Sequence, residues 1–485
     1  MKLIKHFING EFSPAGNGNI IPVTNPATGG QIAEINEAGS AEVSAAVTAA
    51  KNALNGEWST MSVQDRVDIL YRIADGINAR FDDFLEAECL DTGKPYSLAR
   101  HIDIPRGAAN FKIFADTIKN MKEEAFHMPT PDGTGALNYT ISKPKGVIAV
   151  IGPWNLPLLL MTWKVGPALA CGNTVVVKPS EDTPLTTSLL GEVMNDAGVP
   201  AGVYNTVLGT GPVTGNALVT HPDVDAITFT GSTPTGQRIM QAAAVGVRDI
   251  SLELGGKNPG IIFADCDMDK AIEGTLRSVF ANCGQVCLGT ERVYVERPIF
   301  DDFVQRLKRG AEALTLGEPA DNATNLGPLI SDTHRKKVLA FYAKASSEGA
   351  TIITGGGIPD MPEALKAGHW VQPTIWTGLQ DDSAVMTDEI FGPCCHISPF
   401  DNEDEVITRA NSSPYGLASA IWTENITRAH RVAAQIESGI CWVNSWFLRD
   451  LRTPFGGMKQ SGIGREGGHY SLEFYTELKN VCIKL

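Results

Sequence analysis

Apolar residues recur along the first half of the chain in two spacings that predict alternating strands and helices. Short β-branched runs with the length of buried strands lie at 147–151, 174–177, 204–207 and 226–229. Segments long enough for helices, or with helical spacing, lie at about 41–54, 64–80, 157–171, 184–197 and 211–219. Strands that are apolar on both faces and alternate with helices predict a parallel, doubly wound sheet.

After about residue 250 the alternation starts again and predicts a second α/β domain. Expected strands lie near 259–263, 292–296, 351–354, 418–422 and 439–443. Expected helices lie at about 268–282, 300–314, 332–348, 404–411 and 427–436. The first 35 residues are rich in Gly, Asn and Pro and predict extended chain and turns.

A polar, β-prone stretch at about 134–144 interrupts the first half. It could pair with the tail segment TELKNVCIKL to form a small projecting sheet. A two-stranded projection is only marginally stable alone, so we expect it to dock on another subunit.

The charge balance narrows the range of partners. The 485 residues carry a formal charge of −15, with a pI near 5.1. Such acidity disfavours nucleic acid or an anionic membrane as the main partner, and an anionic ligand would need locally placed cations. No run approaches the ~18 apolar residues of a membrane span. Nine scattered cysteines, without a CxxC pair or a cluster with His, predict reduced thiols, no metal site and a cytoplasmic location.

Cys287 is a candidate nucleophile. It lies in FANCGQVCLGTER, where Gly284 and Gly289 allow the backbone to bend and to approach a ligand closely. A thiolate is intrinsically nucleophilic even as a minority species, although a buried, inert thiol is the commoner role for a cysteine. Cys283, four residues earlier, has that inert role as its expected one.

Two further residues at strand ends have chemistry of interest. Glu253 ends an apolar strand, where burial would raise its pKa toward the range of a general base; a salt bridge to Lys257 or Arg292 is the structural alternative. Asn155 follows the strand at 147–151 in GPWNLP, and its amide could stabilise an oxyanion or could simply form a turn.

Two turns could bind a nucleotide. FTGSTPTG ends a strand and opens a helix, and a phosphate would be favourable at that helix N-terminus, although the spacing is not the usual GxGxxG. Glu181, after the strand that ends near Lys178, could accept hydrogen bonds from ribose hydroxyls and would repel a 2′-phosphate. A solvated charged turn is the alternative.

Together these motifs resemble those of the aldehyde dehydrogenase superfamily. GPWNLP, VVKPSE, FTGSTPTG, LELGGKNP, GQVCLGTER, EIFGP and PFGGMKQSGIGREGG stand in the order found in that family. The resemblance runs from NPATG near residue 25 to the tail, and so many matches in register are highly specific.

The resemblance implies a fold, a cofactor and an assembly. It implies a Rossmann-like NAD-binding domain at 1–125 and 146–250, and a catalytic α/β domain at 251–455. A small bridging β element for oligomerisation is expected at 126–145 and 470–485. The expected assembly is a homodimer or homotetramer.

The resemblance also implies roles for individual residues. Cys287 would be the nucleophile, Glu253 the general base and Asn155 the oxyanion donor. Residues that would contact NAD are Trp154, Lys178, Ser180, Glu181, Gly211, Phe229, Gly231, Ser232, Leu254, Glu389 and Phe391. CoA-dependent relatives lack the glutamate, so Glu253 favours hydrolysis of the thioester over transfer to CoA.

The expected substrate is a small anionic aldehyde. Arg106, Arg449 and Arg452 would lie at the substrate entrance of the family fold, where guanidinium groups suit a carboxylate. Structural pairing with Asp103 or Asp450 is the alternative. Arginine in both places, with WFLRDLRTPFGG, resembles the family branch that oxidises muconic semialdehydes. The expectation is 2-hydroxymuconate 6-semialdehyde, with the 2-amino analogue as second choice and a general or CoA-acylating aldehyde dehydrogenase less favoured.

Overall fold

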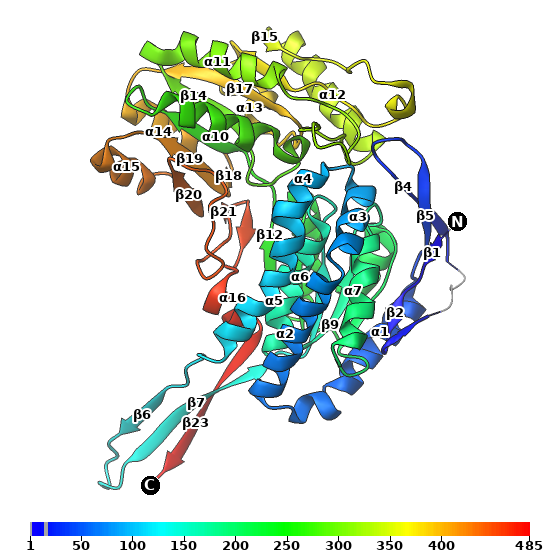
Figure 1. The fold of residues 1–485 in the computed structure, drawn as a ribbon. Helices are drawn as coiled ribbons and strands as arrows, with labels where there is room; N and C mark the ends of the chain where they lie inside the picture. Colours follow the sequence, from blue (N-terminus) through cyan, green and yellow to red (C-terminus); the bar gives the residue numbers. More distant parts are fainter. Residues whose placement is uncertain (1, 14–17) are drawn as a thin grey trace.

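The computed structural model describes residues 2–13 and 18–485. It contains two large, mainly parallel sheets, each flanked by helices, and a small sheet that projects from the body (Figure 1). The predicted α/β class, with parallel sheets, is confirmed.

The first large sheet has eight strands in the order β22-β12-β11-β8-β9-β10-β2-β3. Five central, parallel strands form its core: β8 (Val147–Ile151), β9 (Thr174–Lys178), β10 (Tyr204–Thr206), β11 (Ala226–Thr230) and β12 (Asp249–Glu253). Short antiparallel strands complete its ends: β22 (Gly462–Ile463), β2 (Phe7–Ile8) and β3 (Glu11–Phe12). The four strands predicted from apolar runs are all confirmed.

Alternate residues of β8 show why helices cover both faces of this sheet. Ile148 and Val150 belong to one apolar core, whereas Val147 and Ala149 belong to another, and all four are buried. Helices on the first face are α2 (Val63–Ala79), α3 (Phe81–Thr92), α5 (Ile104–Ile118), α6 (Pro157–Ala170) and α7 (Leu185–Asp196). Helices on the second face are α1 (Ser40–Ala53), α8 (Asn216–Thr220) and α9 (Thr233–Ala244).

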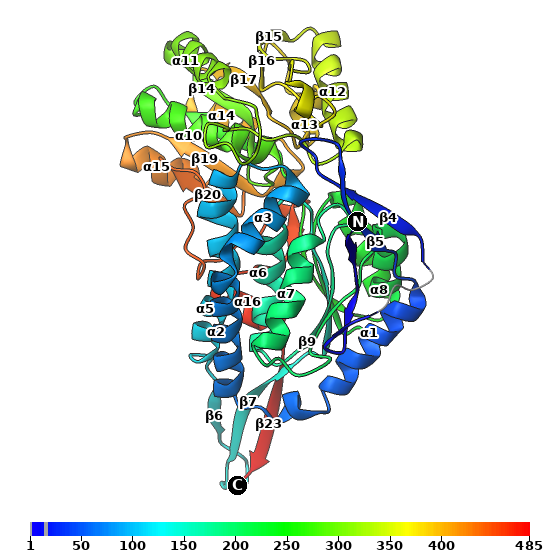
Figure 2. The ribbon, with the colours of Figure 1, turned by 45° about the vertical axis from the view of Figure 1, so that its right-hand side comes forward.

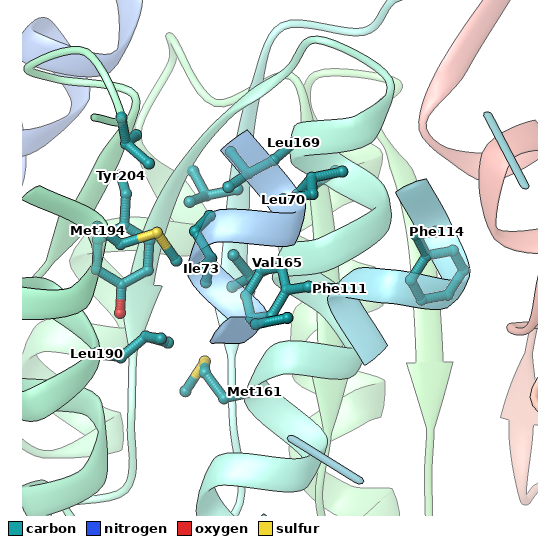
Figure 3. Close-up of a cluster of buried hydrophobic side chains, with 14 of the residues drawn as sticks. Leu70, Ile73, Phe111, Phe114, Met161, Val165, Leu169, Leu190, Met194 and Tyr204 are labelled. Atoms are coloured by element: carbon teal, nitrogen blue, oxygen red, sulfur yellow. The ribbon is translucent and has the colours of Figure 1, made fainter. Parts of the chain in front are cut away.

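The first core joins the long helices to the sheet. Figure 3 shows Ile73 of α2, Phe111 of α5, Val165 of α6 and Leu190 of α7 converging there, with Tyr204 of β10 at one side. Close packing of this kind fixes α5, which carries Arg106, and α6, which begins just after Asn155.

The second large sheet has seven strands in the order β15-β16-β17-β14-β13-β19-β20. Its parallel strands are β13 (Asn258–Ile262), β14 (Thr290–Glu296), β16 (Thr374–Thr377), β17 (Cys394–Phe400), β19 (Ala418–Trp422) and β20 (Ile440–Val443). The edge strand β15 (Thr351–Thr354) is antiparallel. Its helices are α10 (Met268–Phe280), α11 (Phe300–Glu312), α12 (Asp332–Ser347), α14 (Glu403–Asn411) and α15 (Ile426–Ala433).

The projecting sheet pairs two distant parts of the chain, as predicted. β7 (Ala136–Pro144) runs antiparallel to β23 (Thr476–Lys484) along its whole length, and β6 (Ala125–Met128) forms the outer edge. Figures 1 and 2 show this arm extending away from both large sheets.

Several elements differ from the predictions. The N-terminal stretch predicted as extended chain and turns forms a small sheet, with β1 (Lys2–Ile4), β4 (Ile20–Thr24) and β5 (Gln31–Asn36). The strands β6, β16 and β17 and the helix α3 were not predicted. Shorter elements are α4 (Tyr96–Leu98), α13 (Ala384–Thr387), α16 (Gly468–Phe474), β18 (Tyr415–Gly416) and β21 (Met458–Lys459). Within residues 2–13 and 18–485, no helix has the length and apolarity to cross a bilayer.

Candidate active site

A cavity of about 230 Å³ lies between the carboxyl ends of the first sheet and the loops of the second. One wall comes from turns after β8, β11 and β12, the other from the loop before β14, helix α12 and the segment before β17. Predicted residues in its wall are Trp154, Asn155, Gly231, Ser232, Leu254, Cys287, Glu389 and Phe391. Ligands of open α/β sheets bind at such strand ends, so eight of the predicted residues meet at one candidate ligand site.

Cys287 lies in this wall on a sharply bent loop. Asn282, Cys283 and Gly284 have φ values of 52°, 57° and 69°, a left-handed run that turns the chain out of α10. A Cβ at Gly284 would lie 2.0 Å from the carbonyl oxygen of Gly392, so only glycine fits there. Cys283 is buried, in line with its expected inert role.

The electrostatics of Cys287 keep its sulfur protonated until a base acts. Burial, followed by the negative charges of Glu253 and Glu389, raises the pKa of the Cys287 thiol to about 12, while Arg449 opposes the shift. The Asn258 side-chain amide donates to the Cys287 carbonyl oxygen at 2.7 Å and so fixes the backbone at the sulfur. A nucleophilic role for Cys287 therefore requires a general base nearby.

Glu253 has the properties of such a base. It is buried at the end of β12, and both carboxylate oxygens lack a hydrogen-bond partner among the described residues. Burial, followed by the charge of Glu466, raises the pKa of Glu253 well above its ordinary value. The salt-bridge alternative is wrong: Lys257 pairs with Glu291, and Arg292 donates to backbone carbonyls, one of them that of Lys257.

Asn155 is held by its backbone as well as by its side chain. One amide hydrogen of its side chain is donated to the Gln285 carbonyl oxygen at 2.9 Å. Its own carbonyl oxygen accepts from Lys94 Nζ at 3.0 Å and from Asn282 Nδ2 at 3.1 Å. Because a side-chain amide carries two hydrogens, the second remains to donate to an oxyanion formed beside Cys287.

The cavity suits the nicotinamide end of a dinucleotide. Glycines keep its wall thin: a Cβ at Gly231 would lie 2.4 Å from the Phe229 ring, and one at Gly255 would lie 2.4 Å from a Glu389 carboxylate oxygen. Phe229 therefore supports the wall from behind and does not line the cavity. The rings of Trp154 and Phe391 meet edge to face, 5.4 Å between centroids, and give a flat aromatic ring an apolar surface.

The other predicted cofactor residues form a separate group after β9. Lys178 pairs with Glu181 at 3.3 Å, and Ser180 lies between them. Gly211 begins a short π-helix after β10, Gly211–Gly215; a Cβ at Gly215 would lie 3.6 Å from the Lys178 side chain, so this segment ends beside the group. A lysine with an acceptor carboxylate beside it suits ribose hydroxyls. None of these four residues lines the cavity beside Cys287.

His334 and Lys337 of α12 also line the cavity and were not predicted. The His334 ring lies 5.3 Å from that of Trp154 and 6.1 Å from that of Phe391, and burial lowers its pKa to about 4. Lys337 donates to the Glu389 carbonyl oxygen at 3.0 Å. The sequence predicts only that both residues lie in a helix, because their approach to the cavity depends on how α12 packs.

The structure brings Arg106 and Arg449 together but not Arg452. The Arg449 guanidinium lies 4.3 Å from the Trp163 ring and 3.8 Å from the Phe455 ring, and its buried Nε and Nη2 have no partner within the described ranges. Burial, followed by the charge of Arg106, lowers the pKa of Arg449 to about 9. Arg452 instead pairs with Asp450 at 2.6 Å on the surface.

No three His, Cys, Asp or Glu side chains in the described part of the chain are grouped closely enough to hold a metal ion. The reactive groups that the site brings together are the Cys287 thiol, the buried Glu253 carboxylate, the Asn155 amide and the Arg449 guanidinium.

Comparisons with known proteins identify the family of the chain. The chain is 71% identical to a 2-hydroxymuconic semialdehyde dehydrogenase of Pseudomonas sp. (strain CF600), with 100% of both chains covered. It is 53% identical to a 2-aminomuconic 6-semialdehyde dehydrogenase of Pseudomonas sp., covering 100% of this chain and 99% of that protein. An NAD+ complex of an aldehyde dehydrogenase from Bacillus cereus superposes with a TM-score of 0.96 at 40% identity, covering 100% and 97% of the two chains. The aldehyde dehydrogenase family model matches residues 12–481, and the chain belongs to that family.

Proposed function

We propose that this chain oxidises 2-hydroxymuconate 6-semialdehyde to the dicarboxylic acid, with NAD as hydride acceptor. The observation that carries the proposal is the Arg449 guanidinium, which lies near Cys287 and Glu253 and has two buried nitrogens with no hydrogen-bond partner among the described residues. Leaving buried N–H donors of a cation without acceptors is costly, and a substrate carboxylate would satisfy them. The names of the Pseudomonas relatives support the same substrate class.

The first step is addition of Cys287 to the aldehyde. Glu253 in its ionised form takes the thiol proton, and the sulfur forms a bond to the carbonyl carbon. The carbonyl oxygen becomes an oxyanion, which the free amide hydrogen of Asn155 stabilises. The product is a thiohemiacetal attached to Cys287, whose carbon still carries its hydrogen.

The remaining steps release the acid. NAD, when bound, supplies the acceptor for a hydride. Cys287 then holds the acyl group as a thioester. Once Glu253 has released the thiol proton to solvent, it takes a proton from water, whose oxygen attacks the acyl carbon. The carbon–sulfur bond breaks, and the proton passes from Glu253 to the sulfur to restore the Cys287 thiol. The roles of Trp154, Gly231, Ser232, Leu254, Glu389 and Phe391 would be to hold the nicotinamide end, and those of Lys178, Ser180, Glu181 and Gly211 to hold the adenosine end.

The arginines would select the substrate. Arg449 and Arg106 would bind the carboxylate at the end of the substrate far from the aldehyde. Attraction to this pair would also draw an anion toward a protein of net charge −15. Arg452, which is paired with Asp450, would act at most from the surface.

A substrate comparison tests the proposal. Purified enzyme is given NAD and, in turn, 2-hydroxymuconate 6-semialdehyde, its 2-amino analogue and an uncharged aliphatic aldehyde, without CoA. We expect one NADH per aldehyde. The value of kcat/KM should be highest for 2-hydroxymuconate 6-semialdehyde, lower for its 2-amino analogue and lowest for the uncharged aldehyde. A requirement for CoA, or equal kcat/KM for the uncharged aldehyde, would overturn it.

We also propose an organisation and a location for the enzyme. Residues 1–125 and 146–250 would bind NAD, and residues 251–455 would carry the nucleophile. The projecting arm of 126–145 and 470–485 would join subunits in a homodimer or homotetramer; its exposed Phe126, Met128 and Leu478 support this role. All nine cysteines are free, which supports a reducing compartment such as the cytoplasm.

A further inference from the structure

We infer that Glu291 is a positioning residue for the cofactor: paired with Lys257, it holds the Glu389–Phe391 turn in the shape that forms one wall of the cavity. The inference rests on the proposed use of NAD and assigns a role to a carboxylate outside the mechanism above. Glu291 does not itself line the cavity, so it would act through the turn.

Glu291 binds the turn by its backbone. Its carboxylate accepts the N–H of Ile390 at 3.0 Å and the N–H of Phe391 at 2.8 Å. The side chain is 9% exposed, and the same carboxylate forms an ion pair with the fully buried ammonium of Lys257. Hydrogen bonds to an ionised acceptor are stronger than those between neutral groups. The three donors therefore hold this carboxylate in place, and the carboxylate in turn holds the two N–H groups of the turn.

The turn needs such a restraint, because Phe391 has a φ of 63°. A bulky residue in the left-handed region is an outlier that persists only where its surroundings impose it. Glu291 restrains Phe391 on its N–H side. On the carbonyl side, His334 Nε2 lies 2.7 Å from the Phe391 oxygen. The resulting conformation presents the Phe391 ring to Trp154 at the cavity wall.

Lys257 links this turn to the opposite wall. It directly follows Gly256, whose N–H donates to a Glu389 carboxylate oxygen at 2.9 Å. The loop at 254–257 and the turn at 389–391 are therefore joined twice, once through Glu389 and once through the Lys257–Glu291 pair. The pairing also occupies the Lys257 ammonium, which the sequence offered as a salt-bridge partner for Glu253.

Binding of NAD to the substrate-free enzyme tests the inference. Glu291→Gln keeps the side-chain shape but removes the charge and one acceptor oxygen. We expect the Kd for NAD, measured by calorimetry, to rise about tenfold or more. The rate of Cys287 alkylation by iodoacetamide should change less than about twofold, because Asn258, not Glu291, holds that loop. At saturating NAD, kcat should stay near that of the unaltered enzyme.

A matched control lies at the other end of the same strand. Glu296 ends β14 and accepts the N–H of Ala264 at 2.6 Å, far along the strand from the cavity. Glu296→Gln should leave NAD affinity unchanged. Equal Kd values for NAD in Glu291→Gln and the unaltered enzyme would overturn the inference and leave the proposed function standing. Absence of NAD binding by the unaltered enzyme would instead overturn the proposed function and this inference with it.

A double variant separates positioning from charge. Lys257→Met combined with Glu291→Gln removes both members of the pair and leaves no uncompensated buried charge. Weak NAD binding in the double variant would support a positioning role, whereas restored affinity would overturn it in favour of a simple charge effect. If Glu291→Gln does not fold, Glu291→Asp keeps the charge on a shorter stem; weakened NAD binding with normal alkylation supports the inference, and unchanged binding overturns it.

Discussion

Lys94 Nζ lies 3.0 Å from the backbone carbonyl oxygen of Asn155 and so ties the amide donor to a buried ion cluster. The same ammonium pairs with Asp103 at 2.7 Å and with Glu88 at 3.1 Å, and all three side chains are 0% exposed. Glu88 also accepts the N–H of Leu158 at 3.3 Å. The turn between β8 and α6 is thus held at both ends before any substrate arrives.

Removing Lys94 should destabilise the protein. Lys94→Met leaves two buried carboxylates without their cation, and breaking a buried pair in this way costs about 3–5 kcal/mol. Urea unfolding measures the loss. Lys51→Met is the control, because its pair with Asp223 is exposed and little change is expected. Similar losses of unfolding free energy in both variants would show that the buried cluster stabilises the protein no more than the exposed pair does.

Replacing Arg449 should weaken recognition of an anionic aldehyde selectively. Arg449→Met should raise KM for 2-hydroxymuconate 6-semialdehyde about tenfold or more, and KM for an uncharged aldehyde far less. Arg452→Met, three residues along, serves as control and should change neither value, since Arg452 is 73% exposed and paired with Asp450. An equal rise of KM for both aldehydes in Arg449→Met would contradict recognition of a carboxylate.

Replacing Glu253 should slow both halves of the reaction, because the same carboxylate is proposed to take the thiol proton and later a proton from water. Glu253→Gln should lower steady turnover by roughly 10²–10⁴-fold. Rapid mixing followed by mass spectrometry should show a slowed burst of NADH and little acyl group on Cys287. An undiminished burst with acyl groups accumulating on Cys287 would contradict the thiol role and restrict Glu253 to activating water.

Stability should depend on pH through Glu389. Burial, followed by the charge of Glu291, raises the pKa of Glu389 from 4.5 to about 7. The folded protein therefore binds a proton between these values that the unfolded chain does not. This contribution is complete below pH 4.5 and is lost as pH rises to 7, about 3 kcal/mol in all. The difference in unfolding free energy between the unaltered protein and Glu389→Gln should shrink by that amount over the range; a constant difference would refute the raised pKa.

Glu181 should govern the choice between NAD and NADP. Its carboxylate is about one-third exposed and would repel a 2′-phosphate. Glu181→Gln should shift the ratio of kcat/KM values toward NADP by about tenfold. Glu192→Gln on α7, whose carboxylate pairs with Arg80, provides the comparison and should leave the ratio unaltered.

The sequence predicts strands well where both faces are buried and poorly where polar residues interrupt them. β8 and β9 are continuous apolar runs, and their bounds were predicted to within a residue. β17 contains the buried His396 and also Pro399, so its sequence does not read as a strand. Strand β16 was not predicted either, because a run of only four residues gives a weak pattern.

The partners of the side chains at the site were harder to predict from the sequence than the site residues themselves. Arg449 and Arg452 stand three residues apart in one segment, and only tertiary packing makes one buried and the other exposed. Lys257 and Glu291 are 34 residues apart, and nothing local pairs them. The motif resemblance named eight residues that line one cavity in the structure. His334 and Lys337 also line it, but they lie in no such motif and reach the cavity only because of how α12 packs.

The pairing of β7 with β23 also means that the arm can form only at the end of translation. Asn138 and Asn480, joined by a side-chain hydrogen bond between the two strands, are 342 residues apart in the sequence. At 5–20 residues per second, a ribosome needs about 20–70 s to make the second strand after the first has emerged. Throughout that interval one long edge of β7 has no strand beside it, and an open edge invites pairing with other chains. Nascent chains of this enzyme should therefore depend on chaperones most strongly between the release of β7 and the end of translation.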